Sequence, residues 1–327
     1  MPPVCSREEN PDARPHPLPD AADGRSLMRA AVLTAFGGPD MLGWADVDDP
    51  EPGPGEIRIQ VRGAGVGPTD LHLRSGQLAG VFGITPPVVL GFEAAGTVDA
   101  LGAGTTGVAV GDDVAVLLPA LGGYAERAVA SVWVRKPASV AWDAAAALPA
   151  SAEAAVGVLR QLGARDGEHL VVLGAGGSVG LIAVQLALAA GLRVSAVAGD
   201  HDQELLTSLG ATFVAKGASL EASLSSAGRV DAVLDAAGAG GLDAAVRLAG
   251  GPERVVTLVD PTAAALGVRL SQPGPDRAPD ALDVTMPMLA SGALRLKPRT
   301  TVPLAEASRA HALLESSGQH PKIVLTA

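Results

Sequence analysis

Residues 171–200, VVLGAGGSVGLIAVQLALAAGLRVSAVAGD, decide the fold. An apolar run ends at a cluster of glycines, resumes with helical spacing, breaks at Gly191 and becomes a second apolar run that ends at Asp200. The pattern predicts a strand, a helix and a second, parallel strand. The first turn of such a helix has unpartnered backbone N–H groups and the positive end of the helix dipole, so it favours a phosphate group.

The glycine turn is looser than the strict GxGxxG motif. The strand before it, the helix after it and a second strand that ends at Asp200, about 20 residues past Gly180, favour a dinucleotide. Because no Gly-Lys-Ser/Thr follows, a P-loop is not expected. A turn that serves only tight packing is the alternative. The predicted phosphate seat comprises Gly174, Ala175, Gly176, Gly177, Ser178, Val179 and Gly180.

The composition argues against several classes of protein. Hydrophobic residues are 48% of the 327 residues and charged residues 18%, so a sizeable core can be buried. The formal net charge of −11 argues against nucleic acid, because phosphate binding requires a basic surface. The single cysteine, Cys5, excludes an intrachain disulfide and multi-cysteine metal sites, and it suits the cytoplasm. No apolar run is long enough to predict a membrane span.

Pattern also divides the rest of the chain. Residues 1–27 are rich in Pro, Asp and Arg and are predicted to be a disordered leader. From residue 28 to about 137, short strands separated by Gly-rich turns indicate a barrel-like β unit. Alternating strands and helices from Leu170 predict a parallel sheet with helices on both faces. After a Pro-rich stretch the chain ends in a strand that is able to return to the first unit.

The order of several motifs resembles one family. GEIRIQVRGAGVGPTDLHLRSG, PPVVLGFEAAGTV, GDDVAVL, GGYAERAV, GAGGSVGLIAVQLA, LDAAG and PKIVL follow one another as in the medium-chain dehydrogenase/reductases, and most closely as in the zinc-independent quinone oxidoreductases and enoyl reductases. The resemblance implies an α/β fold with a GroES-like domain (28–150 and 276–327), a Rossmann domain (151–275) and a cleft for the nicotinamide. It also implies a homodimer that uses NADPH to reduce quinones, enones or activated alkenes.

The resemblance also implies that zinc is absent. Zinc-dependent relatives have Cys where this chain has Gly67, and GHE where it has GFE, so that Phe92 replaces the histidine ligand. Neither side chain ligates metal, and the structural zinc lobe would need four cysteines. Without metal, catalysis would rest on positioning and on hydrogen bonds to a developing enolate, while the hydride chemistry belongs to the cofactor.

Two departures from the family pattern concern the pocket. The branch has Asn where this chain has Gly67, and Leu-Thr where it has Glu153 and Ala154. We therefore hypothesise a pocket remodelled for a bulkier or unusual substrate, in which Glu153 acts as an acid or base. A solvated position on a helix is the alternative for Glu153.

Further candidates surround the same motif. Asp70 would orient the loop or the substrate, or only cap a turn, and His72 would donate a proton to an enolate, or only lie on the surface. Tyr124, the only tyrosine, would hydrogen-bond a substrate oxygen or belong to the core. The predicted substrate pocket comprises Gly67, Thr69, Arg74 and Phe92, with a salt bridge as the alternative for Arg74.

The residues at the end of the second strand indicate which type of nucleotide is bound. NADPH-preferring relatives place Ser and a basic residue there, whereas this chain has Gly199, Asp200 and His201. Asp200 is suited to a ribose hydroxyl and would repel a phosphate, so the local residues favour NADH and the family favours NADPH. The expectation leans slightly to NADP(H). Further cofactor contacts are assigned to Ala237, Gly238, Val259 and Lys322, with solvation of a strand end as the alternative for Lys322.

The leading prediction is a zinc-independent NAD(P)H oxidoreductase that reduces a conjugated carbonyl. A second hypothesis is an enzyme of specialised metabolism that uses the scaffold for a non-redox cyclisation or elimination. A third is a non-catalytic nucleotide-binding protein. The altered Gly67, Ala154 and Gly199 keep the second and third open.

Overall fold

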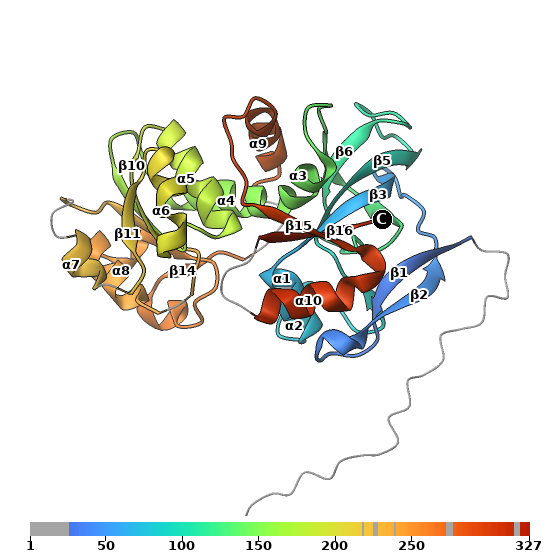
Figure 1. Ribbon diagram of the computed structural model, residues 1–327, viewed down its shortest axis with the longest axis horizontal. Coiled ribbons are helices and arrows are strands. Elements are labelled where there is room, and N and C mark those ends of the chain that lie inside the picture. Colours follow the sequence, from blue (N-terminus) through green and yellow to red (C-terminus); the bar gives the residue numbers. More distant parts are fainter. Residues whose placement is uncertain (1–25, 218, 225–227, 239, 273–276, 317–320) are drawn as a thin grey trace, which may run out of the picture.

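The computed structural model describes residues 26–217, 219–224, 228–238, 240–272, 277–316 and 321–327 (Figure 1). Most of the predicted leader, residues 1–25, lies outside these ranges. The first strand, β1, begins at Leu27, which is inside the stretch predicted to be disordered. The expected order of a β unit, a run of βα units and a returning strand is confirmed.

The β unit contains two sheets. Strands β1 (Leu27–Leu33), β2 (Leu42–Asp48) and β4 (Val88–Val89) form an antiparallel sheet. Alternating apolar residues place Ile57, Ile59 and Val61 on the buried face of β3 in the second sheet. That sheet has the order β15-β16-β3-β5-β6-β8, with β7 paired to β3. Its strands are β3 (Ile57–Val66), β5 (Glu93–Leu101), β6 (Asp113–Leu117), β7 (Arg127–Ala130), β8 (Val132–Arg135), β15 (Arg299–Pro303) and β16 (Lys322–Thr326).

The last strand, β16, closes the β unit. It pairs antiparallel with β3, and Ile323 lies opposite Val66. Residues from the two ends of the chain therefore meet in one sheet, as the sequence led us to expect. The start of β16 lies beside the loop that follows β3, which brings Lys322 close to Gly67.

The intervening segment forms a parallel sheet of six strands. Its order is β11-β10-β9-β12-β13-β14, which is the order of a doubly wound fold with a switch point between β9 and β12. The strands are β9 (His169–Leu173), β10 (Arg193–Ala198), β11 (Thr212–Ala215), β12 (Ala232–Asp235), β13 (Val255–Thr257) and β14 (Arg269–Leu270). The helices that connect them are α5 (Ser178–Ala189), α6 (Gln203–Ser208), α7 (Leu220–Leu224) and α8 (Leu242–Ala249). The division of the chain at residues 151 and 275 stays a prediction.

Helices join the two units. In Figure 1, α3 (Trp142–Ala147) and α4 (Pro149–Leu162) lie between the parallel sheet and the β unit. Pro149 is the first residue of α4, which explains the predicted helix break. The other helices are α1 (Pro68–Arg74), α2 (Ala79–Phe82), α9 (Ala281–Ala290) and α10 (Ala307–Ser316), and short 3₁₀ turns lie at Pro39–Met41, Asp200–Asp202, Pro252–Arg254, Ala263–Leu266 and Leu304–Glu306.

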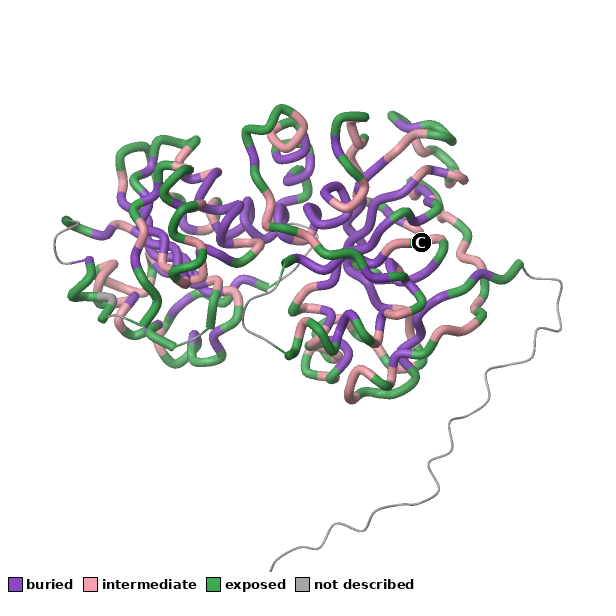
Figure 2. Tube along the Cα trace, viewed as in Figure 1, coloured by how far each residue is buried: buried purple, intermediate pink, exposed green. Residues whose placement is uncertain are grey.

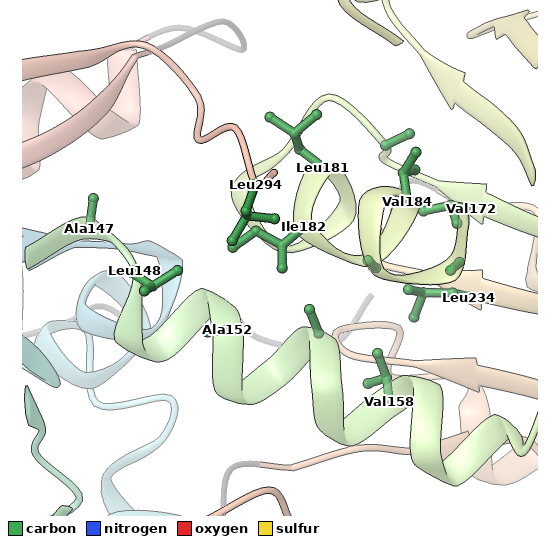
Figure 3. Close-up of a cluster of buried hydrophobic side chains, with 14 of the residues drawn as sticks. Ala147, Leu148, Ala152, Val158, Val172, Leu181, Ile182, Val184, Leu234 and Leu294 are labelled. Carbon is green, nitrogen blue, oxygen red and sulfur yellow. The ribbon is translucent and has the colours of Figure 1, made fainter. Parts of the chain in front are cut away.

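Small apolar residues fill the core, as the composition indicates. Buried segments follow the strands of both units, and exposed segments lie on the outer helices and loops (Figure 2). The largest cluster packs α4 against α5 and the strands behind it (Figure 3). Its labelled members are Ala147, Leu148, Ala152, Val158, Val172, Leu181, Ile182, Val184, Leu234 and Leu294. This cluster fixes α4 and α5, the two helices that border the site described next.

Candidate functional site

A cavity of about 760 Å³ lies between the two units. The β unit contributes the start of α1 and the start of β5, and the parallel sheet contributes the glycine turn and the loops after β12 and β13. The residues used below that line it are Gly67, Thr69, Asp70, His72, Phe92, Glu93, Ala154, Gly177, Ser178, Val179, Gly180, Ala236, Val259, Ser271, Gln272, Arg277, Lys297 and Lys322. A cavity of this size between two domains is the usual setting of a ligand site.

The glycine turn presents backbone to this cavity. Gly174 has a φ of +79°, which favours glycine, and its N–H bonds to Val197 O. A Cβ on Gly180 would overlap the Gly174 carbonyl, so α5 packs closely on the end of β9 only because this residue is glycine. Gly177 is the N-cap of α5 and provides no side-chain cap for the first N–H groups. Of the predicted phosphate seat, the second half lines the cavity, namely Gly177, Ser178, Val179 and Gly180, whereas Gly174, Ala175 and Gly176 do not.

Acidic residues follow β10 beside the turn. Asp200 and His201 are exposed, and the His201 ring packs against Gly199. The Asp202 carboxylate fills the space beside Gly176 where a Cβ would lie, and it approaches His201 Nε2 at 3.1 Å. The sequence predicted one carboxylate after β10, that of Asp200, and the structure adds a second, that of Asp202.

Buried polar bonds order the loop after β12. Asp235 accepts hydrogen bonds from the N–H groups of Ala237 and Gly238, both at 3.0 Å, and from Thr257 Oγ1 at 2.8 Å. Val259 packs against Gly238 and borders the cavity, as does Ala236. Ala237 is exposed beside Gly174, and its cofactor contact stays a prediction.

An ion pair anchors the opposite wall. Lys322 Nζ donates to Glu93 Oε1 at 2.6 Å, and Glu93 Oε2 accepts from the Ala150 N–H at 2.8 Å. Both side chains are almost fully buried. Lys322 borders the cavity, so its cofactor contact stays a prediction, and Glu93, which the sequence did not indicate, compensates its charge.

Asp70 lies at the start of α1. Its Oδ2 accepts the N–H of Gly67, the N-cap residue, at 2.9 Å. Asp70 is 2% exposed, and burial raises the pKa of its carboxyl to about 6. The capping role that the sequence suggested is therefore present, together with a place on the cavity wall.

Two predictions for the same region are corrected. Tyr124 is fully buried and does not line the cavity, because its hydroxyl lies 3.3 Å from His311 Nε2 behind α1. Arg74 does not line the cavity either. It donates to Gly37 O at 3.0 Å, contacts His311 Nδ1 at 3.5 Å and pairs with Glu315, so the salt-bridge alternative is right.

Glu153 requires a stronger correction. It does not line the cavity, and it is not solvated: it is 3% exposed and both carboxylate oxygens pair with the guanidinium of Arg277. Arg277 fits there because Gly157, one turn further along α4, leaves room for its aliphatic stem. Both earlier alternatives for Glu153 are wrong, and Arg277 is the group that faces the cavity.

The remaining pocket predictions agree with the structure. Thr69, His72 and Phe92 line the cavity with Gly67. Phe92 packs edge-to-face on Phe82 with ring centroids 5.6 Å apart, so it forms an apolar wall where metal-dependent relatives have a ligand.

Lys297 is a residue that the sequence reading missed. It precedes β15, lines the cavity and, together with Ser178, a small adjoining cavity at the start of α5. Burial lowers the pKa of Lys297, and the charge of Asp202 opposes this shift. No motif marks Lys297, since it approaches α5 only through the fold.

Comparison with known proteins supports this architecture. Residues 53–134 match the family described as alcohol dehydrogenase GroES-like domain, and residues 209–325 match the family described as zinc-binding dehydrogenase. A quinone oxidoreductase of Rattus norvegicus is 34% identical over 190 residues, which are 57% of each chain. A 2-haloacrylate reductase of Burkholderia sp is 39% identical over 101 residues, 31% of this chain and 30% of that protein. The matched stretches thus span about half or less of these relatives.

Solved structures match over more of the chain. A quinone oxidoreductase from Coxiella burnetii has a TM-score of 0.81 and 26% identity, covering 92% of this chain and 100% of that chain. A structure described as AibC has a TM-score of 0.77 and 30% identity, covering 93% and 96%. No helix among the described residues is long and apolar enough to cross a membrane.

Proposed function

Because the chain belongs to the medium-chain dehydrogenase/reductase superfamily, in its quinone oxidoreductase branch, we propose that it transfers a hydride from NADH to a conjugated carbonyl compound. Quinones, enones and activated alkenes are the substrate classes. The observation that carries the proposal is the single cavity that joins the glycine turn to Gly67, Asp70 and Phe92. One compartment thus holds a dinucleotide seat and an apolar wall with polar groups.

The chain's own residues fit the dinucleotide. The N–H groups at the start of α5 receive the diphosphate, and no side chain blocks them at Gly177 or Gly180. Lys297, beside Ser178, adds a positive charge from the opposite side. Asp200 would accept hydrogen bonds from the ribose hydroxyls, and Val259 would help to hold the nicotinamide. When bound, the cofactor supplies the hydride, and the protein supplies position and the exclusion of water.

We propose NADH rather than NADPH, against the slight preference drawn from the family. A 2′-phosphate at the end of β10 would face the carboxylates of Asp200 and Asp202, and His201 lies against one of them. Lys216, which is exposed directly after β11, contributes one positive charge, and this charge does not balance the two carboxylates.

Zinc has no place in the proposed reaction. The two positions that carry catalytic ligands in zinc-dependent relatives are Gly67, which has no side chain, and Phe92, which presents only carbon to the cavity. The residues present therefore do not fit the metal that one matched family description names, and we route no step through it.

Titration of nicotinamide fluorescence with NADH and NADPH tests the proposal. We expect NADH to bind more tightly. In Asp202→Asn the NADPH Kd should fall about tenfold and by more than the NADH Kd, because the removed charge faces the additional phosphate of NADPH while the shape is kept. Asp243→Asn, exposed on α8, is the matched control and should change neither Kd. Loss of NADH absorbance with an added enone or quinone would then establish the reaction. Binding of neither nucleotide would refute the function.

Assembly and location are further proposals. We propose a cytoplasmic homodimer. The short strand β14 lies at the edge of the six-stranded sheet among the described residues, and such an edge is available for pairing with a second copy. Light scattering of the purified protein gives the mass that checks this.

A further inference from the structure

Of the buried carboxyl groups Glu93, Glu153 and Asp70, two have a cationic partner. Glu93 pairs with Lys322, and Glu153 pairs with Arg277. Asp70 has no ion pair in the described part of the chain. Its Oδ2 caps α1, and its Oδ1 is buried without a hydrogen-bond partner among the described residues. A buried carboxylate oxygen without a partner is costly, so burial favours the protonated carboxyl, which is able to donate a hydrogen bond. Asp70 is also one of the residues that line the cavity.

Arg74, His311 and Tyr124 form a series of polar contacts on the side of Asp70 away from the cavity. Arg74 Nη1 lies 3.5 Å from His311 Nδ1, and a guanidinium group only donates, so Nδ1 is the acceptor. The proton of the neutral imidazole is then on Nε2, which donates to Tyr124 Oη at 3.3 Å. His311 stays neutral because burial and Arg74 lower its pKa to about 3. The hydroxyl proton of Tyr124 is therefore free to turn toward another acceptor.

Burial has the largest influence on the pKa of Asp70, larger than that of the charged groups nearby. Burial raises the pKa of Asp70 most, the Gly67 N–H and the charge of Lys322 lower it, and the charge of Glu93 raises it. Tyr124 is near enough to lower the pKa as well, although no full hydrogen bond joins the two side chains. The result is a carboxyl that exchanges its proton near pH 6.

We propose that Asp70, in its protonated form, is the acid that completes the reduction of the conjugated carbonyl, with Tyr124, His311 and Arg74 as positioning residues. This inference rests on the proposed function. The hydride adds to the β-carbon and leaves an enolate. The Asp70 O–H bond breaks, a C–H bond forms at the α-carbon, and the electron pair of the O–H bond stays on the carboxylate. Tyr124 then donates to that carboxylate, and bulk solvent returns the proton after the product has left.

Asp70→Asn tests the acid directly. The amide oxygen still accepts the Gly67 N–H, so the cap of α1 is kept while the titrating proton is lost. In the protein without nucleotide, an infrared titration should show the carbonyl band of a protonated carboxyl that disappears above about pH 6. The band should be absent in Asp70→Asn and present in Asp40→Asn, an exposed control. The kcat of Asp70→Asn should fall about 100-fold or more, and the NADH Kd should stay unchanged.

Tyr124→Phe tests the positioning. Because the Tyr124 hydroxyl lowers the pKa of Asp70, its removal should raise the pH at which both the infrared band and kcat/KM decline. A variant that only loosened the core would lower activity at every pH without moving that midpoint. The Asp40→Asn control should leave the midpoint in place.

The outcomes separate the two proposals. If the wild type binds NADH and reduces an enone, but Asp70→Asn keeps its kcat and its pH profile, this inference is wrong and the proposed function stands. A similar loss in His72→Gln but not in Asp70→Asn would assign the proton to His72 and overturn it as well. If the wild type reduces no conjugated carbonyl, the proposed function fails, and the infrared titration still reports whether Asp70 carries the proton.

Discussion

Replacing Glu153 by Ala should destabilise the protein strongly. The Glu153 and Arg277 side chains are 3% and 5% exposed, and the guanidinium contacts both carboxylate oxygens. Besides Glu153, Arg277 contacts Ser271 Oγ at 3.3 Å, a neutral group that cannot balance its charge. Truncation thus leaves a cation desolvated and unpaired between α4 and the segment before α9. Breaking a buried pair in this way costs about 3–5 kcal/mol of unfolding free energy.

Urea unfolding of four proteins measures this effect. Wild type, Glu153→Ala, Arg277→Met and the double variant Glu153→Leu/Arg277→Met form the set. Each single change should lower the unfolding free energy by at least about 3 kcal/mol, and the double variant should return to within about 1 kcal/mol of wild type, because two apolar side chains leave no buried charge. Asp243→Ala, which breaks an exposed pair with Arg247, is the control and should cost less than about 0.5 kcal/mol. A loss below 1 kcal/mol in Glu153→Ala would show that water reaches Arg277, and the reasoning from burial would fail.

Three more predictions follow from buried groups. Gly180→Ala should cost about 1–3 kcal/mol in urea unfolding and weaken NADH binding in a fluorescence titration, since its Cβ would meet the Gly174 carbonyl. The pKa of His311 is lowered to about 3, so between pH 6.5 and 3 the unfolded chain binds a proton that the native state does not bind. As the pH falls through this window, up to about 5 kcal/mol of stability is lost. His311→Gln should therefore flatten this part of the curve of Tm against pH. The pKa of Asp70 is raised to about 6, so stability falls as pH rises from 3.8 to 6, by about 3 kcal/mol. Asp70→Asn should therefore unfold at higher urea than wild type at pH 8, and an equal midpoint would contradict the raised pKa.

Much of the fold follows from local pattern. Alternation marked Ile57 and Ile59 as one face of a strand, and the glycine turn with its flanking apolar runs marked the start of the parallel sheet. These signals act within a few residues, and short strands and helical turns depend on neighbours at that range. The returning strand β16 was also accessible, because an apolar run after the last helix needs a sheet to join.

The candidate site was less accessible because its contacts are distant in sequence. Glu153 meets Arg277 across 124 residues, and Tyr124 meets His311 across 187. A sequence shows that a carboxyl exists on a helix, but it does not show which cation will reach it after folding. The reading of Glu153 as catalytic or solvated failed for this reason, whereas the position of Asp70 was found because its partner, Gly67, is local.

The buried carboxyl groups Glu93, Glu153 and Asp70 differ in whether a cationic side chain balances their charge. Glu93 is paired with Lys322 and Glu153 with Arg277, so both charges are compensated. Asp70 performs a task that an asparagine would perform equally well, since a cap needs only an acceptor oxygen. An ionisable group in its place lowers stability at neutral pH and leaves one oxygen buried without a hydrogen-bond partner among the described residues, in a side chain that borders the cavity. This loss of stability serves no structural purpose, and it is expected where a carboxyl is positioned to give a proton to a substrate.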